Sequence, residues 1–418
     1  MKRCLRAVAL SCMGLACASH SVAQGYVLNA DLRAVGAFQS PNGQGPLAWA
    51  NNTLPGIAPP AVDNTALQVD ARGQWKAIHM DAWLAGTRNE GGGTTGEARF
   101  NELYADVDAL GWQWSVGKKI VGWDVGYGFR PNDVVAQEPR RLLLPTTTDG
   151  RAVVQAEHFG AEDAWSLVWV QPERWGRPVD QQRGAEESAF AARGYWRSGS
   201  LDMHAFAREG EHTGPSVGGA LAWVATDALE LHASARLLER HDGWQFGGVP
   251  NTGLASMNPW SQATLGAASQ WLVGASWTGE SQVSVLFEAW HDGTAPSASQ
   301  WRDWNARNIA LSSLASMAAL QRPVAGNLAW QATPFSGTSL QRDNLFLRVA
   351  WQPSEWTASL DALYHPADRG HMLTASLQWQ GDRWRVNVAW RMQGGPSHAV
   401  LAQLPVRRQA VVALTRSF

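Results

Sequence analysis

The sequence repeats one pattern along most of its length: an alternating apolar and polar run, a short polar break, and a second alternating run. At 349–366, VAWQPSEWTASLDALYHP, the break is 353–355, and Trp356, Ala358 and Leu360 then share one parity. A period of two is typical of a β-strand with one apolar face, and three residues suffice only for a turn. The same hairpin pattern returns at 222–237, 275–290 and 377–390. A meander of this length must close, stack or propagate.

The connections between the predicted strands alternate between long and short. Short breaks such as 160–162 and 353–355 follow long ones such as 120–150 and 292–343. This alternation predicts an all-β fold, a transmembrane antiparallel up-and-down β-barrel with short periplasmic turns and long outer loops. A soluble β-sandwich or propeller is the alternative, but neither requires the alternation. We predict 18 strands, with 16 as the alternative count, at 26–38, 65–72, 75–87, 99–109, 111–119, 151–159, 163–171, 187–196, 200–209, 216–225, 228–239, 264–277, 281–291, 344–352, 356–365, 371–380, 383–393 and 408–418.

The first 23 residues have the features of a secretory signal peptide. Lys2, Arg3 and Arg6 precede an apolar run, and 21–23, Ser-Val-Ala, is a small-x-small cleavage site. We therefore expect a signal peptide at 1–23 and a barrel at 24–418. All three cysteines lie in the signal segment, which excludes disulfides and cysteine-based metal sites from the mature chain. Without this segment, Lys and Arg fall from 34 to 31 against 36 Asp and Glu, a balance that excludes a basic nucleic-acid-binding surface.

Charged residues occupy one parity of the predicted strands and apolar residues the other. Leu345, Leu347 and Val349, for example, share a parity opposite to that of Arg348. A charge on the lipid-facing side of a barrel costs roughly 2–4 kcal/mol at the midplane, so the charged parity is predicted to face a wet lumen. These charges either create a transverse field or form wall ion pairs that hold the barrel shape. The predicted lumen-facing set is Asp31, Arg33, Glu102, Asp106, Asp202, Arg208, Glu230, Arg236, Arg348, Asp361 and Arg385.

Tryptophans stand at the necks of the predicted hairpins. An indole at a membrane–water boundary buries its ring and keeps its N–H in contact with water. We therefore predict a periplasmic aromatic girdle; in a soluble β-protein the same residues would be core tryptophans. The predicted girdle consists of Trp112, Trp114, Trp277, Trp351, Trp356, Trp379 and Trp384.

With its signal peptide, alternating strands and terminal Phe418, the chain resembles the porin-type outer-membrane barrels of Gram-negative bacteria. Apart from Arg416, the last strand, QAVVALTRSF, is similar to the assembly signal of that class, which implies recognition by the barrel-assembly machinery. A second likeness, at 111–141, is to alginate-export-like eighteen-strand barrels. It is carried mainly by Gly117, Lys118, Trp123, Pro131 and Asp133, and it implies diffusion or export of a small or polymeric solute.

Two long connections are candidates for shaping the lumen. In porin-type barrels the third outer loop often folds inward, and 120–150 is the third by this count, so Arg130, Arg140 and Arg141, with Lys118, are the candidate constriction residues. Their positive field would favour anions; the alternative is a loop that faces solvent. In the longest connection, 292–343, helical spacing at 307–321 predicts a helix that forms a lid or plug, or lies on the rim.

The sequence as a whole favours an outer-membrane channel for small or extended polar solutes, with no chemistry, no cofactor and no metal. Histidines at positions such as 204 and 232 have no metal-ligand spacing. The expected partners are outer-membrane lipid, the barrel-assembly machinery and a small polar solute, with no nucleic acid. The alternatives are an export portal with a periplasmic partner, an outer-membrane hydrolase with a His and an acid near the loops, and a closed structural barrel.

Overall fold

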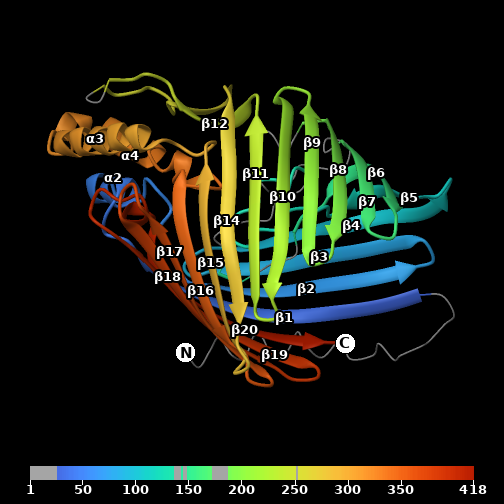
Figure 1. Ribbon diagram of the computed structural model, residues 1–418. Helices are drawn as coiled ribbons and strands as arrows, with labels where there is room; N and C mark the ends of the chain where they lie inside the picture. The colour runs from blue at the N-terminus through green and yellow to red at the C-terminus, as the bar shows by residue number, and fades with distance from the viewer. Residues whose placement is uncertain (1–25, 136–142, 145–147, 172–186, 251–252) are drawn as a thin grey trace.

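Eighteen antiparallel strands form the wall of the molecule (Figure 1). The computed structural model describes residues 26–135, 143–144, 148–171, 187–250 and 253–418, so the predicted signal peptide lies outside the described residues. The wall strands are β1 (Tyr26–Pro41), β2 (Asn64–Trp75), β3 (Ile78–Asn89), β4 (Thr94–Ala109), β5 (Trp112–Lys119), β6 (Arg151–Phe159), β7 (Asp163–Val170), β8 (Ala189–Ser198), β9 (Leu201–Gly210), β10 (Gly214–Thr226), β11 (Leu229–Leu238), β14 (Ala268–Thr278), β15 (Val283–Asp292), β16 (Asp343–Trp351), β17 (Trp356–His365), β18 (Gly370–Gln380), β19 (Trp384–Gly394) and β20 (Val406–Ser417).

The sheet closes on itself through its first and last strands. β1 pairs with β2 on one side and with β20 on the other, with Asp31 opposite Ser417. The backbone N–H of Phe418 donates to the carbonyl oxygen of Ala30 over 2.9 Å. Each remaining wall strand pairs with its sequence neighbours, so the predicted up-and-down barrel of eighteen strands is confirmed, and the alternative count of sixteen is wrong.

Large apolar side chains cover the outside of the barrel. Leu28 on β1, Leu347 on β16 and Val388 on β19 expose 59%, 41% and 42% of their surface. In a water-soluble protein such a continuous apolar surface would be a liability, whereas a bilayer requires it. The two periodic faces of each strand therefore separate an apolar exterior from a more polar interior.

Short helices and a hairpin lie at the long-loop end of the barrel (Figure 1). They are α2 (Pro46–Thr53), α3 (Ala298–Leu314), α4 (Gln321–Trp330), the 3₁₀ turns η4 (Ala318–Leu320), η5 (Thr333–Ser336) and η6 (Leu401–Gln403), and the two-stranded hairpin of β12 (His241–Phe246) and β13 (Trp260–Leu265). The helix predicted at 307–321 begins earlier than expected, at Ala298, and α3 ends at Leu314. The rest of the predicted range contains η4 and the start of α4.

The helical segments pack on each other at the rim. Trp301 and Trp304 of α3 are buried against Phe335 and Leu401, and Leu311 packs on Leu328 of α4. In the part of the chain that is described, no helix is long and apolar enough to cross a membrane. The helices of 292–343 lie at the long-loop end of the barrel (Figure 1), and Thr338, Ser339 and Leu340 of the same connection line the cavity described below.

Candidate functional site

The connection between β5 and β6 enters the barrel. Its described segment 120–135, called here the inner loop, places Val121 and Trp123 in a buried cluster with Val168 of β7 and Phe206 of β9. The rings of Trp123 and Phe206 stack with their centroids 6.4 Å apart. The inner loop therefore lines the inside of the wall rather than extending into solvent.

Two carboxylates of the inner loop fix its own fold. Asp133 Oδ1 accepts hydrogen bonds from the backbone N–H groups of Trp123 and Asp124 over 2.8 and 3.0 Å. Asp124 Oδ2 accepts from the N–H of Asn132 and, over 2.9 Å, from the hydroxyl of Ser234 on β11. Burial raises the pKa of both carboxyls, and these hydrogen bonds act in the opposite direction.

Further contacts join the inner loop to the wall. The side-chain amide of Asn132 donates to the hydroxyl of Ser234 over 2.8 Å. Arg236 of β11 donates to the carbonyl oxygen of Pro131 over 3.2 Å. A third anchor is Glu288 of β15, whose carboxylate accepts two backbone N–H groups from the turn of the loop. Because buried polar groups are costly unless paired, these bonds favour a single position of the loop.

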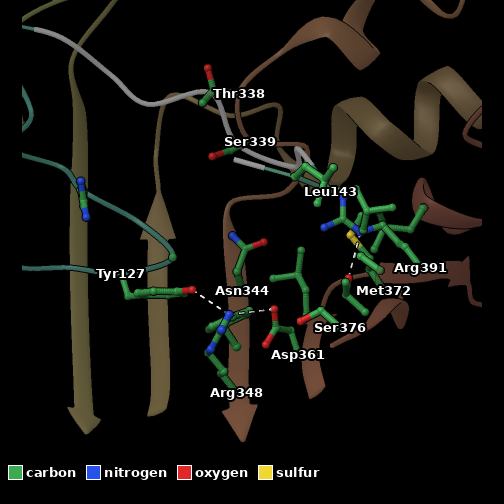
Figure 2. Close-up of a pocket in the computed structure, with 18 of the residues that line it drawn as sticks. Tyr127, Leu143, Thr338, Ser339, Asn344, Arg348, Asp361, Met372, Ser376 and Arg391 are labelled. Carbon is green, nitrogen blue, oxygen red and sulfur yellow. Dashed lines mark hydrogen bonds and ion pairs between the residues drawn. The ribbon is translucent and has the colours of Figure 1, made fainter. Parts of the chain in front are cut away.

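A cavity of about 560 Å³ remains between the inner loop and the wall of β15 to β19. Arg348 crosses it: its guanidinium donates to the hydroxyl of Tyr127 over 2.7 Å and to Asp361 Oδ2 over 3.2 Å (Figure 2). Arg391 of β19 donates to the hydroxyl of Thr374 over 2.9 Å. The rest of the lining is mixed: apolar side chains such as Leu340, Phe346 and Met372 alternate with polar ones that include Ser339, Asn344, Thr357, Ser376, Gln378 and Asn387.

The candidate constriction residues have three different outcomes. Arg130 lines the cavity, 3.7 Å from Asp133. Arg140 and Arg141 lie outside the described residues. Lys118 does not line the cavity, and its largely buried ammonium pairs with Asp149 at 2.5 Å. We do not include Lys118 in the narrow region.

Many of the charges predicted for the lumen contact groups on other strands or loops. Asp31 lies 3.6 Å from Arg385 across the β1–β20–β19 seam, and Arg208 lies 2.8 Å from Glu187. These contacts join segments of the wall that are separate along the chain. The other contacts of this kind are Asp106 with Ser115, Glu102 with the N–H of Ile120, Asp202 with Tyr195, and Arg236 with Ser216. Glu230, by contrast, lies 3.7 Å from His232 on its own strand, β11.

The predicted girdle tryptophans all lie at or near the short-turn ends of their strands. Trp114, Trp277, Trp351, Trp356 and Trp384 expose more than a third of their surface, while Trp112 and Trp379 are half-buried. The indole N–H of Trp379 donates to Glu355 in a short turn over 3.1 Å. Trp75, Trp165 and Trp223 are exposed near the same end, and the sequence analysis did not include them although each precedes or follows a short turn.

The sequence analysis also missed Tyr127, Asp124, Asn132 and Glu288 as residues that shape the cavity. Glu288 had a detectable signal, because it is one of only two acids, with Asp292, on the inward parity of 283–292. The loop residues Tyr127, Asp124 and Asn132 had no such signal, since an irregular segment has no regular alternation of apolar and polar residues. Among the described residues, no three His, Asp or Glu side chains are grouped so as to hold a metal ion.

The comparisons with known proteins concern the fold. No protein-family model and no curated protein matches the sequence. Among solved structures, Acinetobacter baumannii OccAB1 is similar with a TM-score of 0.55 and 9% identity over 95% of this chain and 98% of that one. Pseudomonas aeruginosa OccD3 (OpdP) has a TM-score of 0.52 and 7% identity over 94% and 91%. For OccK11 (OpdR) of the same organism the values are 0.51 and 8% over 94% and 96%. The chain therefore has the closed β-barrel fold of Gram-negative outer-membrane porins.

Proposed function

We propose that the protein is a channel of the outer membrane that lets small polar solutes pass. The observation that carries this proposal is the cavity of about 560 Å³ between the inner loop and β15 to β19, whose mixed lining includes five charged side chains and several hydroxyl and amide groups. Its walls offer hydroxyl, amide and charged groups, which replace part of a solute's hydration. The apolar exterior supports a location in a lipid bilayer. The likeness in fold to outer-membrane porins supports the outer membrane as that bilayer.

The charges of the cavity support a weak preference for anions. Arg130, Arg348 and Arg391 line it with two carboxylates, Asp133 and Asp361, which leaves one positive charge in excess. A narrow region with an excess of one sign concentrates the opposite ion. The size of the cavity favours small solutes over extended polymers.

The route to the membrane is part of the same proposal. Residues 1–23 direct export and are removed, and the last strand, with Phe418 at its end, is recognised by the barrel-assembly machinery. The ring of Phe418 is half exposed and the guanidinium of Arg416 lies 4.8 Å from its centroid. This arrangement leaves an aromatic side chain accessible at the seam.

The test is the conductance of refolded 24–418 in a planar bilayer, with the reversal potential measured across a KCl gradient. We expect steady open steps and a reversal potential on the anion side. A folded barrel that carries no current would overturn the channel and leave the closed structural barrel, a plugged export portal or the hydrolase. For a hydrolase, a single His change would abolish activity and leave the conductance unaltered.

A further inference from the structure

One buried carboxylate on the wall holds the tip of the inner loop. Glu288 of β15 has no exposed surface. Its Oε1 accepts the backbone N–H of Tyr127 over 2.7 Å, and its Oε2 accepts the N–H of Gly128 over 2.6 Å. Hydrogen bonds to an ionised acceptor are about twice as strong as neutral ones, and a buried carboxylate is tolerated because it has them. Both oxygens therefore bind the loop.

The wall orients Glu288 through a histidine. His232 of β11 is buried, and its Nε2 lies 3.0 Å from Glu288 Oε1, so the imidazole donates from Nε2 to the carboxylate. Gly274 of β14 stands between the two in the strand register, opposite His232 on one side and Glu288 on the other. A Cβ on Gly274 would collide with the Nε2 of His232. The missing side chain makes room for the His–Glu contact across three strands.

The loop is shaped to approach the carboxylate closely. A Cβ at Gly128 would lie 3.0 Å from Glu288 Oε2 and 3.2 Å from the ring of Trp290, so a larger residue would push the backbone away from its acceptor. The next residue, Phe129, is buried and stacks on Trp290 with the centroids 5.9 Å apart. The loop and the wall are therefore complementary in shape as well as in hydrogen bonding.

The anchor acts on the cavity through Tyr127. Glu288 does not line the cavity, but Tyr127 does. The Tyr127 ring stacks on Phe346 at 6.0 Å, and its hydroxyl accepts from Arg348. A displacement of the Tyr127 backbone would therefore move the phenol and release one of the groups that hold Arg348 across the cavity (Figure 2).

We propose that Glu288 is a positioning residue that fixes the inner loop in the barrel and so sets the width and steadiness of the passage. The inference rests on the proposed channel function. Glu288→Gln keeps the size of the side chain but offers one acceptor oxygen in place of two, and its NH₂ group opposes the second backbone N–H. The expected result is a loop that exchanges between positions.

The experiment records single-channel current of refolded Glu288→Gln beside the parent chain. We expect the frequency of current fluctuations to rise roughly tenfold or more, since two charge-assisted hydrogen bonds are weakened. The matched control is Glu230→Gln, which removes a carboxylate 3.7 Å from the other nitrogen of His232 but touches no loop backbone. This control should keep the parent's steady current.

A second variant covers the case in which Glu288→Gln does not fold. Gly128→Ala leaves the wall intact and pushes the loop from its own side, and it should give the same fluctuations. A steady parent-like current in both variants, or equal fluctuations in Glu230→Gln, would overturn the positioning role. A silent parent chain would instead refute the channel itself, so the two failures are distinguishable.

Discussion

Arg391 offers a direct test of whether the cavity controls ion selectivity. It lies on the inner face of β19 and donates through Nε to the hydroxyl of Thr374 over 2.9 Å. Arg391→Gln removes one positive charge while its amide keeps a donor within reach of the same hydroxyl. The excess positive charge of the cavity lining then falls from one to zero.

The size of the effect follows from the dimensions of the cavity. A sphere of 560 Å³ has a radius of about 5 Å, so a lining charge acts on a central ion from roughly 6 Å. At that distance two unit charges in water interact by about 0.7 kcal/mol, which 0.1 M salt reduces to about 0.4 kcal/mol. Because the sign is opposite for anion and cation, each changes by about twofold and their permeability ratio by about fourfold.

The assay is the reversal potential under a tenfold KCl gradient, repeated at higher salt, where screening should shrink the difference. The matched control is Arg416→Gln, which removes the same charge from the outer face of β20, where Arg416 lies over the ring of Trp384. We expect the control to retain the parent's reversal potential. If Arg391→Gln shifts the potential no more than Arg416→Gln, the cavity is not where ions are selected.

Two further predictions concern the outer loops. Burial alone would raise the pKa of Glu187, but the hydrogen bond from Thr213 contributes to lowering it below 4.5. Because the pKa of Glu187 is lower in the folded protein than in the unfolded chain, its carboxylate stabilises the fold at pH values above 4.5. This stabilisation is lost as the pH falls through the lowered pKa of the folded state. Glu187→Gln should therefore destabilise the barrel by about 1–3 kcal/mol at neutral pH, and a thermal unfolding series should show the difference vanish in acid; a difference that persists there would contradict this origin. Asp368 accepts the backbone N–H of Val400 over 2.9 Å, so Asp368→Asn should speed proteolysis within 395–405 while the wall stays intact. Unchanged cleavage would show that other contacts hold this connection.

The strands were predictable because each carries its own signal. β17 spans Trp356–His365, as its alternation predicts, since one face of the strand is directed toward lipid and the other toward the lumen. The beginning of β4 was not found: the structure extends it to Thr94, but TTGEAR lacks an apolar parity. Its first residues are exposed on both faces, so no alternation marks them.

The interior of the barrel was less predictable because it depends on residues far apart in sequence. Glu288 binds a backbone N–H 161 positions away, and no local pattern encodes that distance. The hairpin of β12 and β13 was missed because its six-residue strands have no clear period. The start of α3 did have a local signal, the capping box of Ser297 and Gln300, which the spacing argument overlooked.

The seam between β1 and β20 has a consequence for how such a molecule comes into being. The hydroxyl of Ser417 bonds to Asp31 across a separation of 386 positions, and loop closure over such a span is slow. Until it occurs, two long strands present unpaired N–H and C=O groups that any other strand could capture. Once it has occurred, the cylinder has no first or last strand. A circular permutant, with the two ends joined at the seam and new ends opened at a short turn elsewhere, would form the same closed barrel.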